Sequence, residues 1–192
     1  MSNTNLTDIS LIRSVEDLTT AIGSGSSFKY IYFWSHKGTG VGSHCLSQWY
    51  PSKFHVNNSL FYTAEHYMMY RKAILFSDKN AAAQIIEAKD PGKAKHLGRE
   101  IRNFDEEIWA ANRFEIVVEG NVHKFRSNPE LHSFLINTKL RVLVEASPRD
   151  RIWGIGMDKV SAQSQSPFKW KGLNLLGFAL MEARSRLLAT AA

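Results

Sequence analysis

The stretch FYTAEHYMMYRKAILF, residues 61–76, decides the fold and the site expected for this chain. Thr63 can cap a helix that begins at the following residue. Within that helix, Glu65 and Lys72 are offset by about 20° around the axis and by roughly 10 Å along it. This separation is too large for the side-chain pairing of residues three or four apart. It still lets both groups converge on something held between them.

Helical patterns continue through most of the chain, and two short runs have the composition of strands. Apolar residues at helical spacing are expected to face the core: Tyr67, Tyr70, Ile74, Leu173, Leu176, Leu180 and Leu187. Ser77 is the candidate N-cap of the second helix. Strands are predicted at 28–34 and 140–146, and later helices after residue 92, over 106–124 and over 129–138. These patterns predict a flexible lead-in at 1–26, followed over 27–192 by a helix-rich α+β single domain with a small β-sheet.

Composition excludes several classes of protein. No apolar run approaches the ~20 residues that a membrane span needs, and the N-terminus lacks the pattern of a signal peptide. Cys45 is the sole cysteine, so no intrachain disulfide can form. This fits a reducing compartment. We therefore expect a cytoplasmic protein without membrane contacts.

The charge balance favours anionic partners. The formal net charge is +6, and such an excess attracts phosphates and nucleic acid. The basic residues are scattered along the sequence, which argues against sequence-independent nucleic-acid binding and favours a phosphorylated small molecule or a nucleotide group on a larger substrate. Neither HExxH nor CxxC occurs, and His55, His66 and His96 are too far apart for a ligand set, so no metal is expected.

The helix at 64–75 carries the first candidates for catalysis. Glu65 is either a solvated residue or a carboxylate in a partly desolvated site next to Tyr67. Lys72 either keeps its ammonium group in water or, when desolvated, loses its proton and becomes a nucleophile. Trp109, in a later helix, is either a core residue or the wall of a site.

Further candidates follow the predicted strand at 140–146 and lie in the third helix. Asp150 can cap an Asx turn or take part in catalysis. Trp153 and Gly154 can serve packing and a tight turn, or form a stacking platform for a base. Lys95 and Arg99 can hold a phosphate or belong to a surface charge cluster.

Six stretches give these residues a common context: LSQWYPSKF, EHYMMYRKA, AKHLGRE, KFRSNPELHSFLINT, LVEASPRDRIWGIG and GLNLLGFALMEARSRL. In this order they resemble the blocks of the NADAR family, named for NAD- and ADP-ribose-related proteins. The resemblance runs from about Phe33 to Leu188. Its most specific parts are EHY with a lysine seven residues after the glutamate, D-x-x-W-G, and G-x-N-x-L-G. Two departures are Gln48-Trp49, where Asn-Phe is common, and a Met-rich helix where Gln and Ala are common.

The resemblance implies an N-glycosidase fold and a cofactor-free activity. Some members resemble enzymes that cleave the N-glycosidic bond of phosphoribosylated riboflavin-pathway intermediates, and others remove ADP-ribose from guanine bases. By matching position, the resemblance implies catalytic roles for Glu65, Lys72 and Asp150. Substrate-binding roles fall on Trp109, Trp153 and Asn174, and we expect the same of Tyr67, Gly154, Lys95 and Arg99.

We therefore expect an N-glycosidase whose three catalytic groups surround one anomeric carbon. The favoured substrate is ADP-ribosylated guanine in a nucleotide, DNA or RNA, so that the reaction reverses ADP-ribosylation. The first alternative is hydrolysis of a phosphoribosyl-aminopyrimidine from riboflavin synthesis. The others are a non-catalytic ADP-ribose reader and a plain nucleic-acid-binding protein.

Overall fold

Two compact units make up the described part of the chain. One unit is Ser35–Leu135, and the other joins the residues up to Trp34 to those from Ile136 onward. The computed structural model describes residues 9–163 and 165–190. Within these residues, no helix combines the length and the apolarity needed to cross a membrane.

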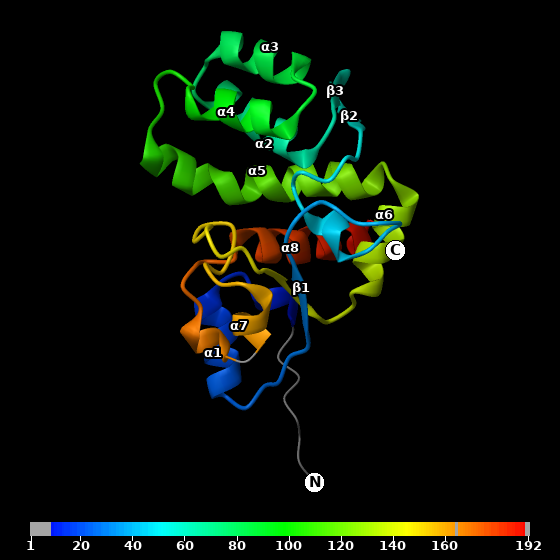
Figure 1. The fold of residues 1–192 in the computed structure, drawn as a ribbon, viewed down its shortest axis with the longest axis vertical. Helices are drawn as coiled ribbons and strands as arrows, with labels where there is room; N and C mark the ends of the chain where they lie inside the picture. The colour runs from blue at the N-terminus through cyan, green and yellow to red at the C-terminus, as the bar shows by residue number, and fades with distance from the viewer. Residues whose placement is uncertain (1–8, 164, 191–192) are drawn as a thin grey trace. The chain divides into compact units, whose positions relative to one another are not determined.

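The Ser35–Leu135 unit is mostly helical. Its elements are η2 (Ser43–Leu46), β2 (Phe54–Val56), β3 (Ser59–Phe61), α2 (Ala64–Leu75), α3 (Lys79–Glu87), α4 (Pro91–Arg99), α5 (Glu106–Arg126) and most of α6 (Pro129–Asn137). Helix α2 contacts α3, α4 and α5, and Figure 1 shows α2, α3 and α4 on one side of the long α5. Gly98 permits the close approach of α4 to α2, because a Cβ there would lie 2.0 Å from the sulfur of Met69.

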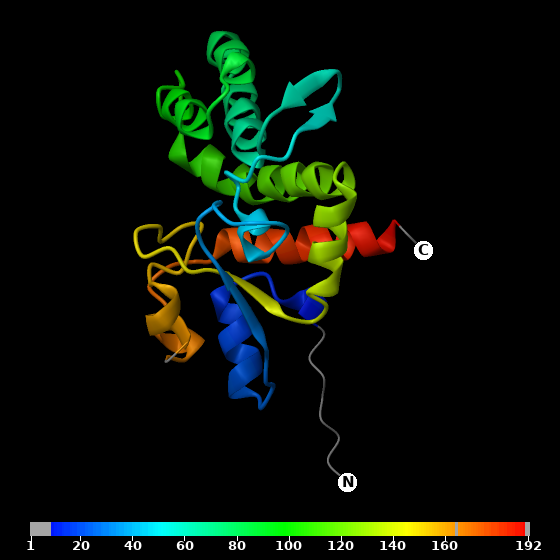
Figure 2. The same cartoon turned by 45° about the vertical axis from the view of Figure 1, so that its right-hand side comes forward.

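A short hairpin precedes α2 and supplies part of this unit's core. Strands β2 and β3 pair antiparallel, with Phe54 opposite Phe61. Asn57 and Asn58 both have positive φ, as a two-residue hairpin turn requires. The Phe54 and Phe61 rings pack against each other and against Tyr67 of α2. The hairpin therefore lies beside α2, as Figure 2 shows.

The junction of α2 and α3 corrects two expectations from the sequence. Ser77 does not cap α3. It has a φ of +59° and ends α2, where its N–H donates to the Ile74 carbonyl and the Asp78 N–H donates to the Ala73 carbonyl. This is the Schellman arrangement, and Asp78 becomes the N-cap of α3. Ile74 was expected in the core but is 44% exposed.

The second unit holds the remaining elements. They are η1 (Ile9–Leu11), α1 (Val15–Gly23), β1 (Tyr30–Phe33), β4 (Val142–Glu145), α7 (Lys159–Gln163), η3 (Pro167–Lys169) and α8 (Leu175–Ala189). The sequence predicted a flexible lead-in at 1–26, but part of this stretch is regular: residues 9–11 form η1 and residues 15–23 form α1. Ser14 caps α1, Leu18 is fully buried, and α1 contacts η3. Residues 1–8 of that lead-in lie outside the described residues.

A two-stranded parallel ladder and α8 form the centre of the second unit. β1 pairs with β4 so that Tyr30 faces Val142 and Phe33 faces Glu145. Helix α8 packs on β4 at a distance that only glycine permits, because a Cβ on Gly177 would lie 2.1 Å from the Leu143 carbonyl oxygen. Leu176, Leu180 and Leu187 are buried, whereas Leu173 precedes α8 and is exposed, contrary to expectation. The fold is thus helix-rich α+β, as the sequence predicted.

Candidate active site

The first turn of α2 buries Glu65. Thr63 caps the helix, with its Oγ1 accepting from the His66 N–H at 3.4 Å. Glu65 is 2% exposed, and its N–H donates to the Gln48 carbonyl at 3.0 Å. A carboxylate here is stabilised by the positive end of the helix dipole. Glu65 therefore lies inside the protein rather than on a solvated face, while its catalytic role stays a prediction.

Two turns later, Lys72 lies against aromatic rings. Its Nζ donates to the Gly98 carbonyl at 2.9 Å, and it sits 4.1 Å from the Phe104 ring centroid and 5.4 Å from that of Trp109. Burial lowers the pKa of Lys72 from its usual 10.5, and the Glu106 carboxylate opposes this effect. Half-burial favours the neutral amine, as in the second of the two alternatives for Lys72, while its catalytic role stays a prediction.

Trp109 and Tyr67 are packed more tightly than binding residues usually are. Trp109 is 7% exposed, so little of its ring is free to stack on a base. The Tyr67 hydroxyl donates to Glu119 at 3.2 Å and accepts from Arg71 at 2.7 Å. A Cβ on Gly120 would lie 2.6 Å from the Tyr67 ring. Tyr67 therefore joins α2 to α5, and the substrate contacts of both residues stay predictions.

The segment that holds the Glu65 N–H is itself anchored by a buried lysine. Lys124 is fully buried, and its Nζ donates to the carbonyls of Cys45 at 2.6 Å and Ser47 at 2.8 Å. Burial lowers the pKa of Lys124 to about 7, and interaction with Cys45 acts in the opposite direction. Burial also raises the pKa of the Cys45 thiol to about 11, so this thiol is a poor nucleophile at neutral pH.

Sequence reasoning missed both Lys124 and the side chain of Gln48. Gln48 is 7% exposed, and within the described part of the chain neither its amide oxygen nor its nitrogen has a hydrogen-bond partner. The sequence did not predict the burial of Lys124, because a lysine in the last turn of a helix usually faces solvent and interacts with the helix dipole. The departure at Gln48 from the pattern of the NADAR family was the one available signal.

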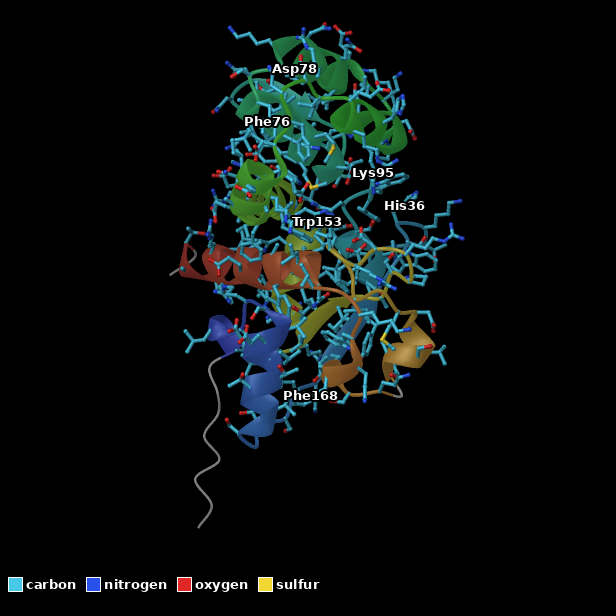
Figure 3. All side chains as sticks on the ribbon, turned by 90° about the vertical axis from the view of Figure 1, so that its left-hand side faces the viewer. His36, Phe76, Asp78, Lys95, Trp153 and Phe168 are labelled. Atoms are coloured by element: carbon cyan, nitrogen blue, oxygen red, sulfur yellow. The ribbon has the colours of Figure 1, made fainter. Side chains whose placement is uncertain are left out.

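The two basic candidates of α4 differ in exposure. Lys95 is half-buried, with its Nζ 5.9 Å from the ring centroid of Trp49. The ring of His36 lies 5.9 Å from the same ring. Figure 3 shows Lys95 and His36 near each other. Arg99 is exposed in the last turn of α4, so the phosphate-binding expectation rests mainly on Lys95.

Asp150 and its neighbours form a tight turn in the second unit. One carboxylate oxygen of Asp150 accepts from the N–H groups of Ile152 at 2.9 Å and Trp153 at 2.7 Å. Gly154 is buried in the turn, where a Cβ would lie 2.9 Å from the Glu145 carbonyl oxygen. The Asx-turn interpretation of Asp150 is therefore confirmed. The turn uses only one carboxylate oxygen, so a catalytic role that depends on the charge of Asp150 stays a prediction.

Asn174 closes the same region. It is fully buried with a φ of +53°. Its amide oxygen accepts from the Glu145 N–H at 2.9 Å, and its amide nitrogen donates to the Leu143 carbonyl at 2.9 Å. Its backbone N–H donates to the Gly154 carbonyl at 3.1 Å. Asn174 thus ties the end of β4 to the start of α8, and its predicted contact with substrate stays a prediction.

The candidate residues divide between the two units. Glu65, Tyr67, Lys72, Lys95, Arg99 and Trp109 belong to Ser35–Leu135, whereas Asp150, Trp153, Gly154 and Asn174 belong to the other unit. In the first unit Lys72 lies beside Trp109, and in the second unit hydrogen bonds join Asp150 to Trp153 and Gly154 to Asn174. That Glu65, Lys72 and Asp150 surround one carbon stays a prediction. No group of three His, Cys, Asp or Glu in the described residues could hold a metal.

A buried glutamate and a half-buried lysine of lowered pKa on one helix are candidates for acid–base or amine chemistry. Residues 32–188 match the family model described as the NADAR domain. The chain therefore belongs to the NADAR family, as its sequence blocks indicated.

Among the known relatives, some are named N-glycosidases and some are named riboflavin biosynthesis proteins. The chain is 43% identical over 161 residues to N-glycosidase R617 of Acanthamoeba polyphaga mimivirus, covering 81% of this chain and 95% of R617. It is 33% identical over 135 residues to the chloroplastic riboflavin biosynthesis protein PYRR of Zea mays, covering 67% of this chain and 20% of PYRR. The NMR structure of the E. coli protein YbiA has the same fold, with a TM-score of 0.69, 24% identity, and 86% of this chain and 89% of YbiA covered.

Proposed function

We propose that this chain is an N-glycosidase that hydrolyses the bond between a ribose and a nitrogen base. The observation that carries the proposal is the buried Glu65 carboxylate at the start of α2, on the same helix as the half-buried Lys72. Membership of the NADAR family supports it, because R617 is named an N-glycosidase. The favoured substrate is guanine carrying ADP-ribose, in a nucleotide or in nucleic acid.

Glu65 suits the demands of this reaction. When the C1′–N bond breaks, its electron pair goes to the base, and positive charge develops on the sugar. A carboxylate removed from water stabilises that charge more strongly than a solvated one would. The same group can take a proton from the attacking water. Glu65 supplies a carboxylate that is 2% exposed and held by a capped helix end.

Lys72 offers a second route through a covalent intermediate. Its neutral amine would attack C1′ while the base leaves and takes a proton, and the resulting adduct would open to an imine that water hydrolyses. Half-burial favours the neutral amine by lowering the pKa of Lys72. The Gly98 carbonyl and the Phe104 ring hold the nitrogen in one position.

The substrate preference has two supports. A net charge of +6 favours a phosphate-rich substrate, and Lys95 lies half-buried beside Trp49, where it can neutralise a diphosphate. The second candidate is a phosphoribosyl-aminopyrimidine. It is favoured by the name of PYRR, of which the chain matches 20%.

Product chromatography separates the candidates. Purified protein is incubated in parallel with ADP-ribosylated guanine nucleotide and with a phosphoribosyl-aminopyrimidine, and free sugar phosphate is followed over time. We expect release of ADP-ribose from the first substrate and slower release from the second. Faster cleavage of the second substrate would establish the riboflavin-type activity instead. Tight binding of ADP-ribose without any release would mark the chain as a non-catalytic reader.

Reduction with borohydride tests the covalent route. The imine route predicts an adduct of ADP-ribose mass on the peptide that contains Lys72. Lys72→Met keeps most of the side-chain volume and should give no adduct. A wild-type reaction that turns over without any trapped adduct would rule out the imine and leave direct attack by water.

A further inference from the structure

Two aromatic rings on the Ser35–Leu135 unit have lysines around them. The Nζ of Lys53 lies 5.4 Å from the Tyr62 ring centroid, and that of Lys89 lies 4.5 Å from it. Lys89 also donates to the Tyr62 hydroxyl, and this hydrogen bond lowers the pKa of Tyr62. The second ring, Trp49, has Lys95 at 5.9 Å. Both rings are partly exposed.

The two rings belong to one surface because the same short segments reach both. The Ser52 N–H donates to the Tyr62 carbonyl at 3.1 Å, which joins Tyr62 to the segment that follows Trp49. The turn between α3 and α4 places Lys89 at Tyr62, and a Cβ on Gly92 would lie 3.5 Å from the Trp49 ring. We call this surface, made of Trp49, Tyr62, Lys53, Lys89, Lys95 and His36, the aromatic–lysine face.

The charge on this face is predominantly positive. Lys53, Lys89, Lys93 and Lys95 lie in its segments, where the acids are Glu87 and Asp90. Asp90 is engaged locally, because its carboxylate accepts from the Lys93 N–H at 2.9 Å and caps α4. Lys89, Lys93 and Lys95 lie close together in the sequence, and folding brings the distant Lys53 to the same ring as Lys89. The scattered pattern that argued against nucleic-acid binding is therefore replaced by a cluster.

We propose that the aromatic–lysine face binds single-stranded nucleic acid. Partly exposed rings offer stacking surfaces for unpaired bases, and nearby lysines neutralise the phosphates between them. In a duplex the bases already stack on one another, so they could not stack on the two rings. Free phosphate or an acidic protein partner would be attracted by the lysines alone and would not require two rings beside them.

The face adjoins the candidate catalytic acid, which links it to the substrate. Gln48, next to Trp49, holds the Glu65 N–H, and Tyr62 lies three residues before Glu65. This inference rests on the proposed function in one respect: a strand whose modified guanine is processed at Glu65 would lay its neighbouring nucleotides on this face. Binding of the strand itself needs no catalysis.

Fluorescence anisotropy with an unmodified, dye-labelled 12-nucleotide DNA strand tests the proposal independently of glycosidase activity. Three lysines in phosphate contact predict a slope of about −2 for log K against log salt. Affinity should therefore fall roughly 20-fold between 50 and 200 mM salt. The same sequence as a duplex should bind at least about tenfold more weakly, since its bases cannot stack on the protein.

Matched variants assign the two contributions. Lys53→Ala with Lys89→Ala should reduce the salt slope by about 1.4, whereas Lys79→Ala, at an exposed lysine in α3, should not change it. Tyr62→Leu should weaken binding about fivefold or more, while Tyr62→Phe, which keeps the ring, should bind as wild type does. Absent binding, equal affinity for duplex and single strand, or no effect of the lysine pair would each overturn the proposal. Cleavage of a modified mononucleotide by the lysine-pair variant would report on the proposed function separately.

Discussion

Replacing Asn174 with alanine should destabilise the protein because the side chain completes two buried hydrogen bonds. The Glu145 N–H donates to its oxygen and the Leu143 carbonyl accepts from its nitrogen, both at 2.9 Å. In Asn174→Ala, one donor and one acceptor at the end of β4 lose their partners. The substitution also puts alanine at a φ of +53°, a conformation that asparagine tolerates better.

The expected loss can be worked from these contacts. A buried group left without its partner costs about 1–3 kcal/mol, so two such groups cost about 2–6 kcal/mol. The left-handed conformation adds about 1 kcal/mol for alanine. Asn174→Ala should therefore lower the free energy of unfolding by about 3–7 kcal/mol. Asn174→Gly, which avoids the backbone strain, should recover about 1 kcal/mol of that loss.

Urea unfolding followed by circular dichroism measures both variants. Asn103→Ala is the control for the backbone term, because Asn103 is exposed and also has a positive φ of 57°. It should cost only about 1 kcal/mol. If Asn174→Ala unfolds within about 0.5 kcal/mol of wild type while substrate affinity falls, the structural role is refuted and Asn174 is a binding residue.

Two further predictions concern charges. In Asp150→Asn the new side chain can still accept from the Ile152 and Trp153 N–H groups, so the free energy of unfolding should stay within about 0.5 kcal/mol of wild type. Hydrolysis should nevertheless slow at least about 10²-fold. An unchanged rate would show that Asp150 only stabilises its turn. For Lys124, whose pKa is lowered to about 7, the unfolded state binds a proton that the folded state lacks between pH 7 and 10. As the pH rises through this range, wild type should therefore gain up to about 1.4 kcal/mol of stability per pH unit relative to Lys124→Met, as measured by urea unfolding. A stability difference between the two proteins that does not change with pH would contradict the lowered pKa.

Much of the fold could be predicted because local signals agreed with the final structure. Thr63 does cap α2, and α5 begins at Glu106 as its pattern indicated. Ser77 was misassigned because a serine after a helix can either end that helix or start the next one. The choice depends on its positive φ, which the sequence does not state. Ile74 and Leu173 kept helical spacing but lie near helix ends, where the buried face is not maintained.

The residue types of the candidate site could be predicted from the sequence, but the structural roles of the individual residues could not. Glu65 and Lys72 could be selected from one helix, whose periodicity fixes their common face. The engagement of Asn174 with β4 depends on contacts about 30 residues away in the sequence, which no local pattern reports. The role of Lys124 could not be predicted for the same reason, since only folding brings its acceptors, the carbonyls of Cys45 and Ser47, next to it.

The most direct test of the central claim is the single-turnover rate of ADP-ribose release from ADP-ribosylated guanine by wild type and by Glu65→Gln. Glutamine keeps the size of the buried side chain and removes its charge. We predict that the rate falls by about 10²–10⁴ while affinity for ADP-ribose stays within a few-fold of wild type. Equal release rates for the two proteins would contradict the account.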